Sequence, residues 1–539
     1  MTKRRGKYAI GILAALVIFS YVSLQHFQFF INHFWSVASG RKEYILLLQN
    51  NNELRPGGGF VTAYANVTLH WGVPTRLAFH NSYEIDTKAY IKPPYPQEEL
   101  LKDARYQGYT FRDANWNPNF PDAAADIVHF YEQKFPQEHI DGLMVVNFNV
   151  IEKLLAEVGS IDLGDKVVDH QSLFSALEFE VNNVDRHNVE ALGGRKNVLK
   201  DLGYALMKKT IWHPFTTLSV MNTAIDEKDF YFWFRDEALQ EKISALGWAN
   251  DLLLPEKTDF LGVNLANLGS KKADRYLIKN TEYYVDLSGS EPTMHVKVAL
   301  NFPGKLNSYS DPYRGYLRVI IPGNAKVTHQ PEGSQIENLG ALKSIGAIVN
   351  LGASSSGEWT FDYTLPRRTF KTDEYALKLQ KQSGDMMHYL VVVSGANETQ
   401  LKSNQFDVRE NKAFFRGTLL NDLILGLHIN PDATPPYPIE QRFDSLNQIS
   451  IIWSEPITSD TAHALKKYSI RDMNVTNAAI TDIPKIEQID VDQNVTRLKL
   501  SGITAQPLEQ YQIIMTDMKD RGQNVIEPNP KTITAVQRI

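Results

Sequence analysis

The stretch QNNNELRPGGGF, from Gln49 to Phe60, connects two apolar segments of the chain. The segment before it, Tyr44 to Gln49, predicts a buried strand, and the segment after it, Val61 to Leu69, alternates with the period of two that is typical of a strand. A hairpin between two such strands needs only two to five residues, with one or two glycines at positive φ. The additional amides, Glu53 and Arg55 therefore indicate that this connection does more than reverse the chain.

The sequence on either side of this connection predicts a mixed α/β domain over residues 41–279. The short apolar run Gly142 to Val146 predicts a strand, and the residues after it up to Gly159 have the spacing of an amphipathic helix. A strand followed directly by a helix is the unit from which α/β layers are built. Two further helices are predicted, at Pro121–Phe135 and Arg195–Thr210.

The second half of the chain predicts β-structure only. Short strands separated by turn residues fill residues 280–429, which is the pattern of a β-sandwich. The proline-rich segment NPDATPPYPIE at residues 430–440 predicts a linker. Residues 441–539 then predict a small all-β domain that resembles a bacterial Ig-like domain through IIWSEPIT and YQIIMTDMKDRGQNVI, and such domains are commonly spacers.

The N-terminus predicts the location of the protein. Residues 1–7 contain the basic run KRRGK and are expected to form a cytoplasmic tail, and the chain then has no Lys, Arg, Asp or Glu from Tyr8 to Gly40. An uncharged apolar segment of this length, at residues 8–35, predicts a transmembrane helix with the basic end inside. The alternatives are a cleaved signal peptide, with SVASG as its cleavage site, or a buried helix. We therefore expect a single-pass membrane protein whose bulk is extracytoplasmic.

Composition excludes some classes of function. The formal net charge of −6 over 539 residues argues against a nucleic-acid partner, which normally requires a basic surface. The chain has no cysteine, which excludes disulfides, thiolate metal sites and cysteine nucleophiles.

Six segments between residues 41 and 429 carry a resemblance to a known family. They are YILLLQNNNELRPGGGF, RDANWNPNFPDAAADIVHFY, IDGLMVVNFNVIEKLLAEVGSIDL, NLANLGSKKADRYLIK, YRGYLRVIIPG and YALKLQKQSG. In the same order, they resemble the bacterial membrane-anchored family known as domain of unknown function 4012. The family name implies no activity.

Part of the mixed domain is also similar to the LytR-CpsA-Psr family. The strand ILLL followed by an arginine, then DGLMVVNFNVIEKLLAEVGSIDL and GGRKNVLKDLGYALMKK, occur in a similar order. Members of that family transfer polyprenyl-pyrophosphate-linked glycans onto the cell wall, using arginines, aspartates and magnesium. The resemblance implies a shared fold, although the Pro-Arg-Asp motif of that family has no clear counterpart here.

The residues of the opening stretch are consistent with an anion site. Successive N–H groups of glycines can form an anion-binding concavity, and the planar guanidinium of Arg55 matches phosphate or carboxylate. Cations at the start of the helix that follows Gly193 face the positive end of its dipole, and a bound anion would remove that penalty. The candidate anion-binding residues are Asn51, Asn52, Arg55, Gly57, Gly58, Gly59, Arg112, Arg195 and Lys196.

An alternative explains the same residues without a ligand. The glycines would permit a tight bend, the asparagines would satisfy the backbone, and Arg55 would pair with Glu53 or with a core carboxylate. Arg195 and Lys196 would then be solvated.

The cofactor and the function depend on this choice. Asp113 is the candidate ligand of Mg²⁺, which prefers one or two protein carboxylates together with substrate oxygens and water. The sequence predicts either an envelope protein that binds or transfers a polyprenyl-pyrophosphate-linked glycan, or a non-catalytic cell-surface protein for adhesion or structure. In either case the partners would be the cytoplasmic membrane and cell-wall glycan or its lipid carrier.

Overall fold

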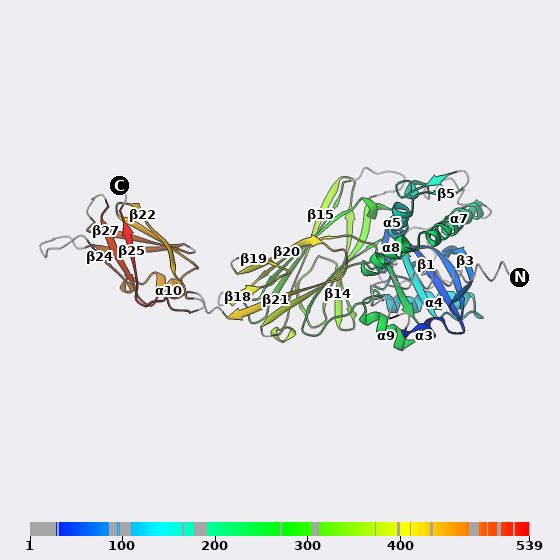
Figure 1. Cartoon of the computed structure of the whole chain (residues 1–539), viewed down its shortest axis with the longest axis horizontal. Coiled ribbons are helices and arrows are strands. Elements are labelled where there is room, and N and C mark those ends of the chain that lie inside the picture. Colours follow the sequence, from blue (N-terminus) through cyan, green and yellow to red (C-terminus); the bar gives the residue numbers. More distant parts are fainter. Residues whose placement is uncertain are drawn as a thin grey trace.

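The computed structural model has three parts arranged along its long axis (Figure 1). A mixed α/β domain comes first, a large β-sandwich follows it, and a smaller β-unit contains the C-terminus. The structure describes residues 29, 32–85, 94, 96–97, 109–163, 166–176, 191–269, 272–303, 312–371, 373–395, 399–409, 411–431, 435–473, 484–492, 494–503, 508–520 and 523–537.

The predicted transmembrane segment falls almost entirely outside these residues. The short helix α3 (Phe34–Ala38) contains its last described residues. Within the described ranges, no helix combines the length and apolarity needed to cross a membrane. The transmembrane segment therefore stays a prediction from the sequence.

A five-stranded sheet forms the centre of the mixed domain, in the order β3-β2-β1-β4-β7. Strands β1 and β4 run parallel, and the other neighbours run antiparallel. Both strands predicted around the opening stretch are confirmed, because they lie within β1 and β2. The strands are β1 (Arg41–Arg55), β2 (Gly58–His70), β3 (Val73–Asn81), β4 (Gly142–Asn147) and β7 (Phe230–Phe234).

Helices cover both faces of this sheet because successive residues of β1 are apolar. Ile45 and Leu47 pack in one cluster with residues of α4, whereas Leu46 and Leu48 pack on the other side with residues of α5 and α8. All three predicted helices are present. The helices are α4 (Phe120–Lys134), α5 (Phe148–Val158), α7 (Ala191–Trp212), α8 (Pro214–Asp226) and α9 (Glu237–Ala245).

Two seven-stranded sheets face each other in the sandwich and enclose the largest hydrophobic core. The first sheet contains, in order, β12 (Lys326–His329), β15 (Ser355–Thr364), β10 (Thr293–Phe302), β9 (Ile278–Asp286), β17 (His388–Ser394), β20 (Lys412–Thr418) and β19 (Asp407–Arg409). The second contains β13 (Gln335–Leu339), β14 (Leu342–Leu351), β11 (Tyr313–Pro322), β8 (Asp259–Asn267), β16 (Glu374–Gln380), β21 (Leu423–Pro431) and β18 (Thr399–Lys402).

The sandwich begins earlier than the sequence predicted. Strand β8 was expected in the mixed domain, which we placed at residues 41–279, but it pairs with β11 and β16 of the sandwich. Every residue of β8 is buried, so its sequence fits a central strand of either sheet. Only its pairing with distant strands assigns β8 to the sandwich. The boundary between the mixed domain and the sandwich therefore lies before Asp259.

The C-terminal unit also packs two sheets around a separate core. Its first strand begins at Pro438, within the predicted linker of residues 430–440, and β21 of the sandwich extends to Pro431, so the connection is shorter than expected. One sheet contains β22 (Pro438–Ser445), β23 (Gln448–Trp453), β26 (Val495–Ser501) and β25 (Lys485–Asp492); the other contains β24 (Tyr468–Asp472), β27 (Gln510–Met515) and β28 (Lys531–Val536). Its classification as Ig-like stays a prediction.

Asp259, the first residue of β8, should make the stability of the sandwich depend on pH. Its carboxylate is fully buried and accepts hydrogen bonds from the hydroxyls of Tyr283 (2.5 Å) and Tyr375 (2.6 Å). Burial raises the pKa of Asp259 to about 6, although these hydrogen bonds oppose the shift. The native state thus binds its proton more tightly than the unfolded chain, so stability should fall as pH rises from about 4 to about 6.

The expected loss is on the order of 3 kcal/mol, because one pKa unit corresponds to about 1.4 kcal/mol. Thermal unfolding of the sandwich at several pH values in this range measures the loss. Asp259→Asn should remove this part of the slope of stability against pH, whatever the absolute stability of the variant. An unchanged slope in the variant would contradict the assignment to Asp259.

Candidate functional site: a buried polar joint between two domains

The opening stretch forms a bulge at the junction of the mixed domain and the sandwich. The β1–β2 pairing shifts between Asn50 and Leu54, so residues 51–53 have no partner in the ladder. The shift turns Leu54 into the sandwich, where it is fully buried in the core. The surplus residues of the connection therefore allow the end of β1 to cross from one domain into the next.

Arg55 is fully buried at this crossing, and all three of its guanidinium nitrogens donate hydrogen bonds. Nε and Nη2 donate to one carboxylate oxygen of Asp113, at 3.2 and 3.1 Å. Nη2 also donates to Glu53 at 3.0 Å, and Nη1 donates to the carbonyl oxygens of Leu54 and Asn267, each at 3.1 Å. The arginine holds two carboxylates of the mixed domain and one carbonyl of the sandwich, and it faces no open cleft.

The glycines permit close packing, and two of their N–H groups donate within the fold. The Gly57 N–H donates to the carbonyl of Asn115 at 3.1 Å, and the Gly59 N–H donates to the side chain of Gln49, also at 3.1 Å. A Cβ on Gly59 would lie 2.5 Å from the nitrogen of Asn51. Gly58 has a φ of +129°, which side chains rarely adopt.

The structure therefore gives no support to an anion site at the opening stretch, which stays a prediction from the sequence. A concavity for phosphate needs N–H groups that are not already used, and Gly57 and Gly59 donate within the fold. The alternative, in which Arg55 pairs with Glu53 and a core carboxylate, is what the structure shows.

The sandwich contributes the segment after β16 to this junction. The side-chain amide of Gln382 donates to the carbonyls of Arg55 (3.0 Å) and Leu265 (2.7 Å), and its oxygen accepts from the Leu265 N–H at 2.7 Å. Ser383 accepts a hydrogen bond from the amide of Asn147 at 2.8 Å. One glutamine thus joins the end of β1 to β8.

Gly384 completes the contact between the domains. Asn51 in the bulge donates to its carbonyl at 3.0 Å, and its own N–H donates to Asp229 of the mixed domain at 2.9 Å. We refer to the contacts among residues 49–59, 264–269, 272–274, 380–385 and Asp229 as the polar joint.

Asp229 is buried beside two lysines. Its carboxylate lies 3.4 Å from Nζ of Lys381, in the sandwich, and 3.6 Å from Nζ of Lys153, on α5. Burial by itself would raise the pKa of Asp229, but Lys381, Lys153 and the hydrogen bonds it accepts outweigh that effect and lower it. The carboxylate therefore stays ionised and links the two domains electrostatically.

A second ion pair crosses the junction nearby. Lys228 of the mixed domain lies 2.7 Å from Asp422 of the sandwich, and the lysine side chain is 4% exposed. Burial opposes ionisation of Asp422, yet Lys228 and Lys378 together lower its pKa. Two ion pairs, Asp229 with Lys381 and Lys228 with the partly exposed Asp422, thus connect the two domains.

Among the other predicted site residues, Asp113, Asn52 and Arg112 each contact another residue of the fold. Asp113 is buried and paired with Arg55, and Asn52 accepts from Arg275 at 3.2 Å. Arg112 lies over the ring of Tyr83, 4.4 Å from its centre. Arg195 and Lys196 lie in the first turns of α7, and their side chains are outside the part that the structure describes.

Asp113, the proposed magnesium ligand, lies between two arginines, and the magnesium site stays a prediction from the sequence. Both Asp113 oxygens lie near cations, one bonded to Arg55 and the other 3.7 Å from Nε of Arg112. Among the described residues, there is no group of three or more His, Asp or Glu side chains that could hold a metal ion.

Sequence reasoning missed the sandwich half of the joint, although a signal was present. Gln382, Ser383 and Gly384 belong to YALKLQKQSG, where a polar run directly follows an apolar strand, as it does in the opening stretch. Asn264 and Asn267 belong to NLANLGSKKADRYLIK. Three of the segments that supported the family resemblance therefore meet at one place.

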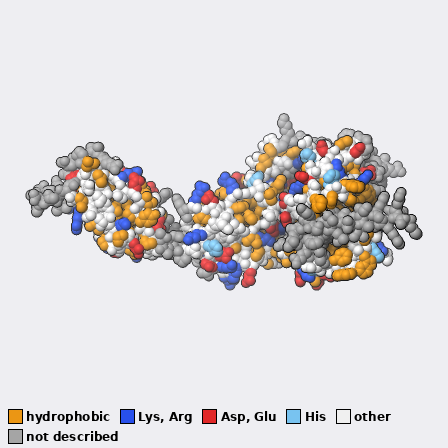
Figure 2. All heavy atoms as spheres, in the orientation of Figure 1, with side chains coloured by type: hydrophobic (Ala, Val, Ile, Leu, Met, Phe, Trp, Pro, Cys, Tyr) orange, Lys and Arg blue, Asp and Glu red, His pale blue; other side chains and the backbone are white. Residues whose placement is uncertain are grey.

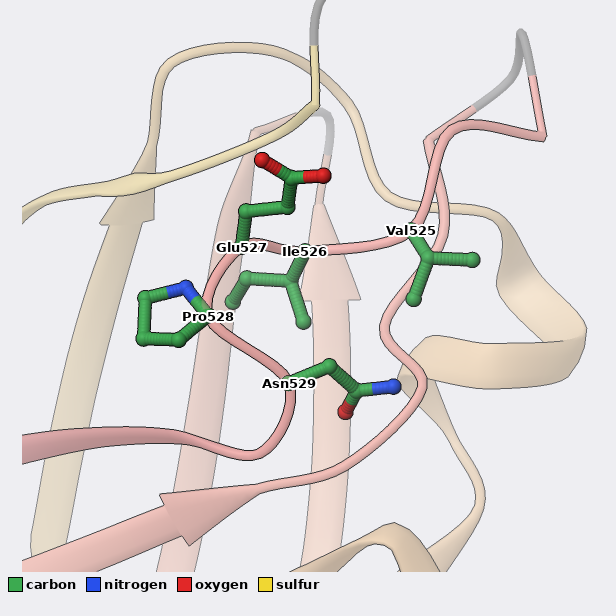
Figure 3. Close-up of a pocket in the computed structure, with 5 residues that line it drawn as sticks. All are labelled: Val525, Ile526, Glu527, Pro528 and Asn529. Carbon is green, nitrogen blue, oxygen red and sulfur yellow. The ribbon is translucent and has the colours of Figure 1, made fainter.

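A shallow hollow elsewhere has no relation to the joint. It lies in the C-terminal unit and is lined by Val525, Ile526, Glu527, Pro528 and Asn529 (Figure 3). Among its described lining residues, Glu527 is the only one with a carboxylate.

Comparison with known proteins identifies the segment that contains the bulge. Residues 39–181 match the family described as protein of unknown function (DUF4012). The match supports the resemblance over this segment, which includes β1, β2 and Asp113. No curated protein matches the chain.

Solved structures give only weak similarities. The N-terminal part of the bacterial S-layer protein SbsC is 14% identical, with a TM-score of 0.17, over 20% of this chain and 24% of that chain. Lin1025 from Listeria innocua is 11% identical, with a TM-score of 0.21, over 39% of this chain and 80% of that chain. The protein described as the transcriptional regulator yvhJ from Bacillus subtilis is 13% identical, with a TM-score of 0.22, over 39% of this chain and 76% of that chain.

This chain spans about a quarter of the SbsC chain, and TM-scores this low carry no argument about fold or function. The similarity to the LytR-CpsA-Psr family stays a prediction.

Proposed function

We propose that this protein is a non-catalytic, membrane-anchored structural protein of the cell surface. In this proposal the mixed domain and the sandwich act as one rigid body that carries the C-terminal β-unit away from the membrane. The observation that supports it is the burial of Arg55, Asp113 and Gln382, which belong to the quoted segments, in contacts between or beneath the domains, together with the burial of Asp229.

The energetics of such a joint favour a fixed arrangement over a mobile one. Separating the domains would expose Lys381 and leave Asp229 without a sandwich partner, and breaking one buried ion pair typically costs about 3–5 kcal/mol. Interfaces within a chain that lack such contacts permit relative domain motion. A spacer on a surface benefits from stiffness because its tip then stays at a set distance.

The shape is consistent with this role. The sandwich lies between the mixed domain and the C-terminal unit, at opposite ends of the long axis (Figure 1). On the face drawn in Figure 2, the described Lys, Arg, Asp and Glu side chains are interspersed along the molecule. The membrane location and contacts with cell-wall glycan belong to the proposal and come from the sequence.

Rigidity is tested by spin-label distances in a chain that has no native cysteine. Labels at Ala238→Cys and Asn338→Cys, exposed on the mixed domain and the sandwich, should give one narrow distance distribution. The pair Asn338→Cys and Lys466→Cys, which spans the connection at residues 432–437, is the comparison. If the distance distribution between positions 238 and 338 is as broad as that expected for a flexible linker, the joint is not rigid.

The same samples test the absence of a pyrophosphate site. Magnesium and a short polyprenyl pyrophosphate should leave the Tm unchanged, whereas a ligand at a hundred times its Kd would add about 2.7 kcal/mol of stability. A Tm that rises with ligand concentration would support the glycan-carrier function instead.

A further inference from the structure

Three exposed aromatic side chains form a cluster at the start of the described chain. Phe34 and Trp35 belong to α3 and are 43% and 67% exposed, and Trp71, at the β2–β3 turn, is 55% exposed. The rings of Trp35 and Trp71 meet edge to face at 6.1 Å, and those of Phe34 and Trp35 at 5.8 Å. We refer to Phe34, Trp35 and Trp71 as the aromatic cluster.

The turn and the helix are fitted to each other. The Trp71 N–H donates to the carbonyl of Gly40 at 2.7 Å, which ties the turn to the residue before β1. A Cβ on Gly72 would lie 3.1 Å from the ring of Phe34, so the turn approaches α3 as closely as glycine permits. The turn and α3 therefore hold the three aromatic side chains together as one surface.

Trp71 occupies a backbone conformation that does not suit it. Its φ is +51° and that of Gly72 is +76°, the pattern of a two-residue hairpin turn that strongly favours Asn-Gly or Gly-Gly. A bulky residue at positive φ is an outlier, and such strain is retained where the residue has a use. The Trp71 indole is 55% exposed and belongs to none of the hydrophobic clusters of the described residues, so burial in a core does not explain why this strain is retained.

We propose that the aromatic cluster rests in the interfacial region of the lipid bilayer. This inference depends on the proposed membrane anchor, because the uncharged segment that predicts it runs directly into α3. Trp is enriched at membrane interfaces, where its ring is buried among lipids and its N–H remains among the headgroups. Arg41, which follows α3, pairs with Glu43 at 2.7 Å, and its side chain is 71% exposed, so the guanidinium can also reach lipid phosphates.

Contact with the bilayer would fix the tilt of the rigid body on the membrane. A single helical anchor permits rotation, whereas an anchor together with two indoles at the interface defines which side of the mixed domain faces the lipid. The direction in which the sandwich projects would then be set by the cluster.

The experiment uses the full chain reconstituted in phosphatidylcholine–phosphatidylglycerol vesicles. Nitroxides at Ser36→Cys and His70→Cys, exposed positions next to the cluster, report contact with lipid, and Asn338→Cys on the sandwich is the control. The ratio of collisions with oxygen to collisions with a water-soluble nickel chelate should be several-fold higher at positions 36 and 70 than at 338. The pair of substitutions Trp35→Ala and Trp71→Gly should lower the ratio at position 36 toward the control.

Three results are distinguished. Protein that does not float with vesicles contradicts the anchor, and thereby the proposed function. Protein that floats but has equal ratios at positions 36, 70 and 338 contradicts only the role of the aromatic cluster. If collisions of the nickel chelate with positions 36 and 70 instead become rarer as the protein-to-lipid ratio rises, the cluster makes contacts between copies of the protein. That result would also overturn the inference.

Discussion

Replacing Arg55 with methionine should destabilise the mixed domain and sandwich by about 3–5 kcal/mol, because the substitution leaves two buried carboxylates without their cation. Glu53 and Asp113 both lie within 3.1 Å of Nη2 of Arg55, and their side chains are 9% and 3% exposed. Chemical denaturation of the full chain, followed by the fluorescence of its buried tryptophans, measures the loss.

Arg409 provides the matched control. It pairs with Asp407 at 2.7 Å in the sandwich, but the two side chains are 76% and 59% exposed. Exposed pairs contribute about 0–1 kcal/mol, so Arg409→Met should have little effect. Equal losses from Arg55→Met and Arg409→Met would show that the joint is open to water in solution.

A third variant separates charge from packing. Adding Glu53→Gln and Asp113→Asn to Arg55→Met removes both orphaned charges, and replacing a whole buried ion pair by neutral groups is often close to neutral. We therefore expect this triple variant to regain most of the lost stability. No recovery would mean that the shape of the arginine, rather than its charge, holds the site together.

Local patterns predicted much of the secondary structure around the site. Alternation in Val61–Leu69, the apolar run at Gly142–Val146 and the helical spacing before Gly159 depend on near neighbours in the chain, and each element is present. Gly159 ends α5 at a φ of +83°, as a glycine after a helix commonly does.

The site was not predicted because its partners are distant in the chain. Gln382 donates a hydrogen bond to the carbonyl of Arg55, 327 positions earlier in the chain. The sequence around Arg55 does not indicate this partner. An arginine beside glycines has the same local pattern whether it faces a phosphate or a buried carboxylate. Burial decides between them, and burial here is created by the sandwich, which packs against the end of β1.

The same reasoning explains the misplaced domain boundary. Strand β8 is buried along its whole length, so its composition fits a central strand of either sheet. The side chain of Asn264 and the backbone carbonyl of Asn267 bond to the mixed domain, whereas the strands that pair with β8 belong to the sandwich. A strand that belongs to one domain and contacts the other cannot be assigned from its own residues.

Gly384 offers the sharpest test of whether the polar joint is closely packed. Its φ is +73°, and a Cβ there would lie 2.7 Å from Cβ of Asn51 and 3.3 Å from the carbonyl of Gly58. Gly384→Ala should therefore cost about 1–2 kcal/mol for the backbone conformation and a further 1–3 kcal/mol for overpacking. Since the new methyl group lies between the domains, the distance distribution between labels at positions 238 and 338 should also widen.

Gly333 separates the two contributions. It has a φ of +75°, but no atom lies within 4 Å of its added Cβ, so Gly333→Ala has the backbone cost alone. The difference in unfolding free energy between the two variants then measures the steric cost of entering the joint. Equal losses, with an unchanged distance distribution in Gly384→Ala, would mean that the joint has room for a methyl group and that the two domains are held together by their cores rather than by the polar contacts between them.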